Sequence, residues 1–224
     1  MFIGHFAVGL AAKRGAPKTS LGTLFLAAQF VDLLWPLLLL LGLERVEIAP
    51  GNTVVTPLAF VSYPISHSLL TDLGWATLFA GLYQALKRYR RGAFWVWTVV
   101  ISHWLLDALV HRPDLPLYPG SRTLVGLGLW NSLPGTLLAE GGMFAVGLAL
   151  YLKATRAKDK IGLYAFWALM IVLIISYLGA LFGPPPPSVS VVAISALFMW
   201  VFLPWAYWVD RHREARASAP PPHA

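Results

Sequence analysis

The stretch AFWVWTVVISHWLLDALVH, residues 93–111, is an apolar run of membrane-spanning length that nevertheless carries three ionisable side chains. A membrane-spanning helix needs about 20 mostly apolar residues. His103, Asp107 and His111 follow one another at steps of four, so they share one face of a helix. Ionisable groups at membrane depth are costly unless they are paired or coordinated. The polar stripe therefore predicts a functional site.

The rest of the chain resembles this stretch in composition. Of its 224 residues, 58% are hydrophobic and 12% are charged, whereas soluble domains have about 25% charged residues. Apolar runs of near-spanning length cover residues 22–42, 66–86, 93–110, 135–152, 161–183 and 189–209. The pattern predicts an all-α fold, a polytopic membrane bundle of about six transmembrane helices. Residues 1–12 are apolar but too short to span, and we expect an N-terminal half-helix there.

We expect one helical membrane domain over residues 1–217. Within it, residues 1–155 form the part with the metal site, and residues 160–210 form a helical scaffold that has no charged side chain between its first residue and Asp210. We expect the tail 218–224 to be disordered. Cysteine is absent, which excludes disulfides and thiolate metal sites.

The net charge of +7 indicates an orientation in a membrane and not a nucleic acid partner. Most basic residues lie in four segments, which alternate with connections that hold few of them. These residues are Lys13, Arg14, Lys18, Lys87, Arg88, Arg90, Arg91, Lys153, Arg156, Lys158, Lys160, Arg211, Arg213 and Arg216. The positive-inside rule places the four segments in the cytoplasm. We therefore expect a multi-pass protein of the cell inner membrane whose partner is a membrane lipid or a lipid-linked molecule, with no indication of its oligomeric state.

Counting along the other runs places further polar side chains in the outer half of the same bundle. Asp32 falls about 15 Å into the first run, and His67 lies at the outer entrance of the second. Asp72 lies about one turn deeper than His67, and Glu140 lies about 9 Å into the fourth run. The half-helix carries His5 to a similar depth. Separate segments of the chain therefore converge on one polar site.

Histidine and carboxylate without cysteine form the ligand set of hydrolytic zinc, manganese or iron sites. We expect a divalent transition metal, zinc first, as one or two ions. Such ions activate water and stabilise a phosphoryl transition state. Carboxylates and histidines also build proton pathways in transporters, and a buried His–Asp pair can pin two helices together, so these interpretations stay open.

Several motifs resemble the inner-membrane metal-dependent hydrolases. They are His5 with Gly9, Asp32 in QFVDLLWP, SHS at 66–68 and SHWLLD at 102–107. Their order is also distantly similar to that in zinc-dependent phospholipase C. The resemblance covers residues 1–115 and implies metal-dependent hydrolysis, with metal ligands at His5, Asp32, His67, His103 and Asp107.

The family pattern is incomplete in this chain. Val31 stands in place of a proline, and Leu34 and Trp35 replace a second aspartate and a histidine. The arginine that precedes the HS motif is also absent. We therefore add His111 as a sixth candidate ligand, and we assign Glu140 and Asp72 as catalytic groups that take a proton from water.

The sequence thus predicts a membrane-embedded metal-dependent hydrolase of a lipid-linked ester or phosphoester. Two alternatives stay open: a non-catalytic membrane protein with a structural metal site, and a proton-coupled transporter or permease. The transporter is the weaker alternative, because the polar groups crowd the outer half of the bundle while the inner ends of the runs are almost wholly apolar.

Overall fold

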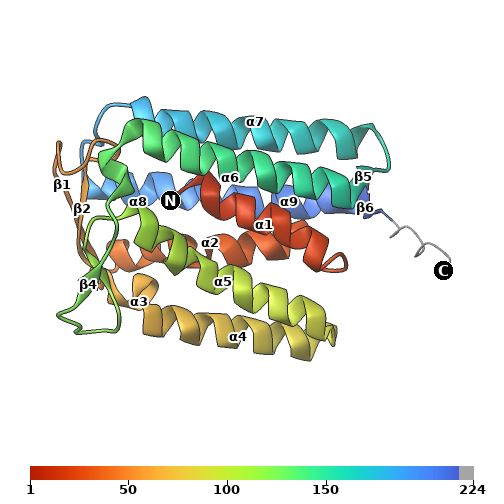
Figure 1. Cartoon of the computed structure of the whole chain (residues 1–224), viewed down its shortest axis with the longest axis horizontal. Coiled ribbons are helices and arrows are strands. Elements are labelled where there is room, and N and C mark those ends of the chain that lie inside the picture. The colour runs from red at the N-terminus through yellow and green to blue at the C-terminus, as the bar shows by residue number, and fades with distance from the viewer. Residues whose placement is uncertain (217–224) are drawn as a thin grey trace.

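The computed structural model describes residues 1–216, and the predicted tail at 218–224 lies outside the described residues. The described chain is mostly helical, which confirms the all-α prediction (Figure 1). Its long helices run along a common axis. They are α2 (Leu21–Leu40), α4 (Leu69–Lys87), α5 (Arg90–Val110), α6 (Leu133–Ala154), α7 (Lys160–Phe182) and the continuous segment α8 (Val189–Leu197), η2 (Phe198–Val201) and α9 (Phe202–Arg211).

Five helices in the described range are long and apolar enough to cross a membrane, judged by length and composition: α2, α5, α6, α7 and the segment Val189–Arg211. The chain therefore has the elements of a membrane protein. The remaining long helix, α4, is not among the five; it carries Asp72 and Gln84 and packs along α5.

The short helix α1 (Ile3–Gly15) lies near the N-terminus, where a half-helix was expected. Its 13 residues make it about 20 Å long. It begins in the interior of the bundle and packs along α6 (Figure 1). A Cβ atom on Gly147 of α6 would collide with the backbone carbonyl of Ala7, so a glycine is needed for this close approach.

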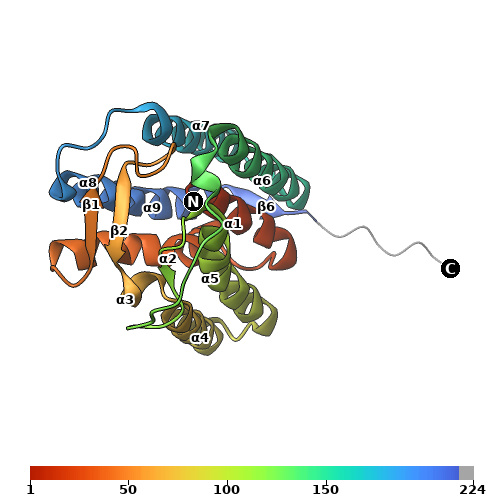
Figure 2. The ribbon, with the colours of Figure 1, turned by 60° about the vertical axis from the view of Figure 1, so that its left-hand side comes forward.

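Short elements that the sequence did not predict cover one end of the bundle (Figure 2). The strands β1 (Arg45–Ile48) and β2 (Leu58–Ser62) pair as an antiparallel hairpin. The single turn α3 (Pro64–His67) follows β2. After α5, β3 (Leu115–Pro116) pairs with β4 (Leu124–Val125), and the turn η1 (Leu129–Asn131) leads into α6.

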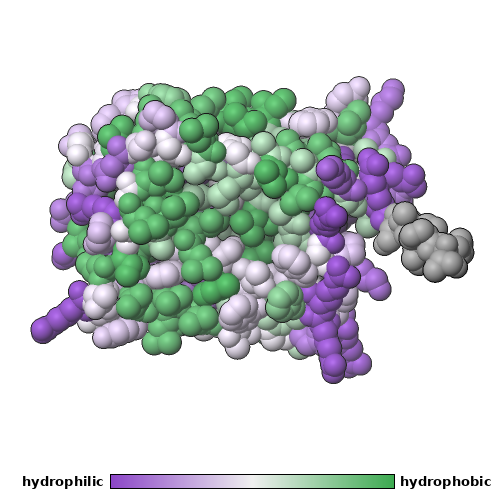
Figure 3. All heavy atoms as spheres, in the orientation of Figure 1, coloured by the Kyte–Doolittle hydropathy of each residue, from purple (hydrophilic) through white to green (hydrophobic). Residues whose placement is uncertain are grey.

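The four basic segments lie together at the opposite end of the bundle (Figure 1), where Figure 3 shows hydrophilic residues beside a largely hydrophobic belt. There β5 (Thr155–Ala157) pairs with β6 (Arg213–Ala215). The Nζ atom of Lys13 lies 2.7 Å from Oδ1 of Asp210, which ties α1 to α9. The shared location is what the positive-inside interpretation requires.

Candidate metal centre

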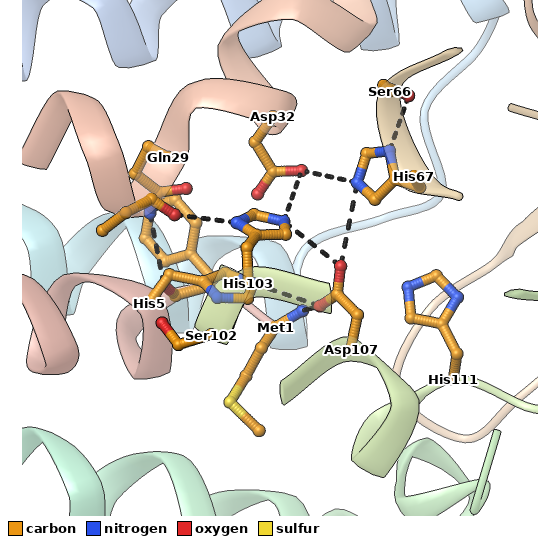
Figure 4. Close-up of polar contacts among 12 residues, drawn as sticks. Met1, His5, Gln29, Asp32, Ser66, His67, Ser102, His103, Asp107 and His111 are labelled. Carbon is orange, nitrogen blue, oxygen red and sulfur yellow. Dashed lines mark hydrogen bonds and ion pairs between the residues drawn. The ribbon is translucent and has the colours of Figure 1, made fainter. Parts of the chain in front are cut away.

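Five of the six predicted metal ligands meet in the interior of the bundle (Figure 4). Four elements contribute them. They are His5 from α1, Asp32 from α2, His67 from α3, and His103 and Asp107 from α5. The ligands fall into two groups that share His103, and the ligand atoms of each group lie within 4.8 Å of one another. All but the partly exposed Asp32 are buried.

Four histidine–aspartate separations in the cluster are close to the distance between two ligands of a tetrahedral metal ion. Nε2 of His67 lies 3.3 Å from Asp32 Oδ1 and 3.7 Å from Asp107 Oδ2. Nε2 of His103 lies 3.6 Å from Asp32 Oδ1 and 3.2 Å from Asp107 Oδ2. Tetrahedral ligands with bonds of about 2.1 Å are about 3.4 Å apart. Each of the two three-residue groups, which share His103, could therefore supply ligands to one metal ion.

The second oxygen of Asp107 faces the other side of the cluster. Its Oδ1 lies 3.1 Å from Nε2 of His5 and 2.6 Å from the amino group of Met1. The rings of His5 and His103 stack with their centroids 3.6 Å apart. Asp107 thus presents one oxygen to His5 and the other to His67 and His103, so the cluster could hold one metal ion or two.

Hydrogen bonds behind two of the histidines orient their Nε2 atoms toward the cluster. His103 Nδ1 donates to the carbonyl of Ala28 at 2.7 Å. His67 Nδ1 lies 2.6 Å from Ser66 Oγ, and the Ser66 hydroxyl donates to Glu44 at 2.6 Å. Because the single Ser66 proton goes to Glu44, Ser66 accepts the proton of His67 Nδ1. Such partners fix the ring and leave the other nitrogen free to bind a metal.

Glu44 is a buried acidic residue behind the cluster that was not among the predicted site residues. It is 2% exposed and accepts hydrogen bonds from the backbone N–H groups of Ile65 and Ser66, each at 2.8 Å. Together with the bond from Ser66 Oγ, these contacts hold the turn α3 in place. Glu44 lies 22 residues before Ser66, the residue through which it acts on His67. No local sequence motif therefore links Glu44 to His67.

The expected run 66–86 is broken directly after His67. Pro64 occupies the first turn of α3, and Ser68 ends that turn in an extended conformation. The Ser68 side chain then caps α4 by accepting a hydrogen bond from the backbone N–H of Thr71. This break separates His67 from the axis of α4 and allows its ring to turn toward Asp32.

The cluster requires a positive charge among its ligand atoms. Nε2 of His103 is buried, has no hydrogen-bond partner in the described chain, and faces carboxylate oxygens of Asp32 and Asp107. A nitrogen lone pair beside two carboxylates is unfavourable unless a proton or a cation lies between them. A divalent cation therefore fits the donor set and its geometry.

The two predicted catalytic carboxylates lie in different surroundings. Glu140 Oε2 accepts hydrogen bonds from the N–H groups of Phe2 at 2.8 Å and Gly4 at 3.2 Å, which satisfies donors at the start of α1. Glu140 also lines a pocket beside the cluster. Asp72 is fully buried, and neither of its carboxylate oxygens has a hydrogen-bond partner among the described residues. It belongs to neither ligand group and does not line that pocket.

His111 does not join the predicted metal ligands, because it follows the last residue of α5 and its ring turns to a different partner. Its Nδ1 lies 2.9 Å from Asp114 Oδ1, which also accepts a hydrogen bond from Tyr63. Burial lowers the pKa of His111, and the bond to Asp114 opposes this shift. The ring packs on Trp130 and lines the pocket. In Figure 4 it lies beside the network without belonging to it.

The pocket beside the cluster has a volume of about 430 Å³, within the usual range for ligand sites. Asp32, His67 and Glu140 give it a polar side. Apolar residues of α7, α8 and η2 give it an apolar side. The segment 160–210, which we expected to be a scaffold, thus also forms part of this wall.

Comparisons with known proteins give the chain no relative. No protein-family model matches it, and searches of curated proteins and of solved structures find no match. What the centre does must therefore be argued from its own geometry.

Proposed function

We propose that the protein is a membrane-embedded, metal-dependent hydrolase of a lipid-linked ester or phosphoester, similar to the inner-membrane metal-dependent hydrolases. The observation that carries the proposal is the convergence of His5, Asp32, His67, His103 and Asp107 from four elements, with separations suited to a metal. Helix pinning alone would need one His–Asp pair, whereas five such side chains from four elements meet here.

The five residues would hold one or two divalent ions, with zinc preferred for this donor set. When bound, such an ion activates water and stabilises negative charge on the reacting group. Glu140 is the candidate proton acceptor, because it lines the pocket and its hydrogen bonds from Phe2 and Gly4 both use Oε2. Asp72 remains a second candidate, although it lies outside the pocket lining.

We further propose that α4 completes a set of six spans and that α1 is a half-helix in the inner half of the membrane. The protein would then lie in the inner membrane of the cell, with the basic end of the bundle facing the cytoplasm. The metal centre would lie toward the opposite, outer side. This arrangement is supported by the basic segments, which share one end, and by α4, which packs along α5.

The test is to reconstitute the purified protein in liposomes and to follow phospholipid cleavage and proton flux in parallel. We expect cleavage without flux, lost in Asp107→Asn and in Glu140→Gln. The glutamine oxygen can still accept the two N–H bonds of α1, so Glu140→Gln should retain its metal. His212→Ala is the matched control, because His212 contacts Asp159 at the basic end.

Two other outcomes would replace this proposal. Flux without cleavage would identify a proton-coupled transporter. Bound metal with neither cleavage nor flux, across neutral and anionic phospholipids and their lysolipids, would identify a structural metal site in a non-catalytic protein.

A further inference from the structure

We propose that the cleft between α7 and α8 binds a hydrocarbon chain of the lipid substrate, which reaches the metal centre sideways from the membrane. The identity of this lipid as a substrate rests on the proposed function. The chain-binding site itself rests on the walls of the pocket, on the lipid-suited outer faces of its helices and on its polar end.

Two facing helices build the apolar wall. α7 contributes Ser176, Tyr177, Ala180 and Leu181, while α8 and η2 contribute Ser195, Ala196, Phe198 and Met199. Ser176 and Ala180 are one turn apart and therefore lie on the same face of α7. Small side chains on both helices leave space between them, and the larger ones present carbon atoms to that space.

The separation of α7 and α8 follows from the sequence of the last span. Pro204 has no N–H group with which to bond the carbonyl of Trp200, and the helix tightens into η2 over Phe198–Val201 just before it. Beyond this point α9 packs against α7, and Trp205 Nε1 donates to the carbonyl of Ala165 at 3.0 Å. The two segments are thus joined near the basic end and part toward the metal centre.

The helices on either side of the cleft carry exposed side chains suited to lipid. Ile175 of α7 is 62% exposed, Ile194 of α8 is 54% exposed and Phe198 of η2 is 68% exposed. All three lie in helices long and apolar enough to cross a membrane. A molecule that passes between these helices would therefore come from the hydrocarbon layer and not from water.

The polar end of the pocket offers donors for a headgroup. Tyr177 is 4% exposed, lines the pocket, and its hydroxyl has no hydrogen-bond partner in the described chain. Trp35 also lines the pocket, and its buried Nε1 has no partner there either. Buried donors of this kind need an acceptor. The ester or phosphate oxygens of a lipid whose reacting group lies at Asp32 would supply it.

The short elements at the end of the bundle cover the alternative route from water. Val55, in the turn between β1 and β2, donates its N–H to the carbonyl of Trp130 at 3.1 Å. Val55, Phe60 and Trp130 all line the pocket. Because the hairpin and η1 close over this side, the gap between α7 and α8 is the access route that suits an amphiphile.

The experiment uses the purified protein in phosphatidylcholine–phosphatidylglycerol nanodiscs. These contain a phospholipid with a photoactivatable diazirine near the end of one acyl chain. Cross-links are mapped by mass spectrometry in Ala180→Phe and Ala196→Phe, which narrow the cleft. Ile175→Phe and Ile194→Phe are the matched controls, because these residues lie on the same two helices outside the pocket. Thermal melting and metal content verify that each variant folds.

We expect wild-type cross-links at 176–181 and 195–199, lost in the two narrowed variants and retained in the controls. Cleavage of long-chain phospholipid should fall at least about tenfold in the narrowed variants, the effect of ~1.4 kcal/mol of lost binding. Cleavage of a short-chain, water-soluble phosphoester should not change. Labels spread evenly over the lipid-facing side chains, or equal labelling in all four variants, would overturn the proposal.

The two proposals fail in different ways. If the narrowed variants retain metal and cleave both substrates as the wild type does, the chain-binding site is wrong and the hydrolase stands. If the wild type cleaves neither substrate but its cross-links map to the cleft and disappear on narrowing, the hydrolase is wrong. The cleft is then a lipid site.

Discussion

Glu44→Gln is the substitution that most sharply separates a metal centre from a set of buried hydrogen bonds. Glu44 Oε1 accepts the N–H groups of Ile65 and Ser66, and its Oε2 accepts the hydroxyl of Ser66. A glutamine oxygen can accept the same two N–H groups. Its amide nitrogen can only donate, so Ser66 must then accept from it and turn its own proton toward His67 Nδ1.

The consequence is a change of tautomer at His67. With Nδ1 accepting a proton from Ser66, the ring proton moves to Nε2, the atom that lies 3.3 Å from Asp32. A protonated Nε2 is not a metal ligand. We expect zinc affinity to fall by about 10–100-fold, the range found when such outer partners of a ligand are removed, or about 1.4–2.7 kcal/mol.

Folding stability should also fall, by about 1 kcal/mol, because hydrogen bonds to a charged carboxylate become hydrogen bonds to a neutral amide. The assay is competition for zinc against a chelator of known affinity, with thermal melting in parallel. Glu47→Gln is the matched control, because Glu47 is an exposed residue of β1. Wild-type zinc affinity in Glu44→Gln would refute the proposed orientation of His67.

Three further predictions concern packing, charge and orientation. Gly147→Ala should destabilise the protein by about 1–3 kcal/mol in thermal melting because its Cβ would meet the backbone of α1, whereas Gly142→Ala, with open space around it, should not. A hydrogen bond from His212 lowers the pKa of Asp159. This contact should therefore stabilise the protein fully at pH values above the ordinary aspartate pKa of about 4, and the stabilisation should be lost as the pH falls through the lowered pKa. The difference in melting temperature between the wild type and Asp159→Asn, which keeps the helix cap, should shrink as the pH is lowered. A difference in melting temperature that does not change with pH would contradict this. Cysteine at Arg90 should resist impermeant thiol reagents in intact cells and cysteine at Arg122 should react; the reverse pattern would invert the orientation.

The sequence predicted the helices and the core of the site because both follow from local periodicity. Spacings of four on a helix place His103 and Asp107 together, and apolar length gives the long helices. A short helix near the N-terminus that carries His5 was expected on the same grounds. Five predicted ligands consequently meet in the structure.

What the sequence did not predict depends on contacts between distant segments. Glu44 reaches His67 only through the fold of the β1–β2 hairpin and α3. For His111 the signal was present nearby, since Asp114 follows three residues later and offers a carboxylate to Nδ1. A polar side chain at a helix end satisfies the nearest acceptor, and helical periodicity alone does not reveal this competition.

The pocket wall was missed for a different reason. Residues of α7 and α8 carry no charge, and small side chains such as Ala180 and Ala196 look the same in sequence whether they pack against a helix or leave a cleft open. Only the packing distinguishes the two cases: α9 packs against α7, whereas α8 packs against α2.

Metal analysis of the detergent-purified protein is the most direct test of the central claim. We expect at least about one divalent transition metal per chain, and a fall in melting temperature when a chelator removes it, because a cation bound only to the folded state stabilises that state. His103→Ala should abolish metal binding, while His111→Ala, outside both ligand groups, should retain it. A metal-free wild-type protein that takes up no added zinc, and whose melting is unchanged by chelator and by zinc, would contradict the account.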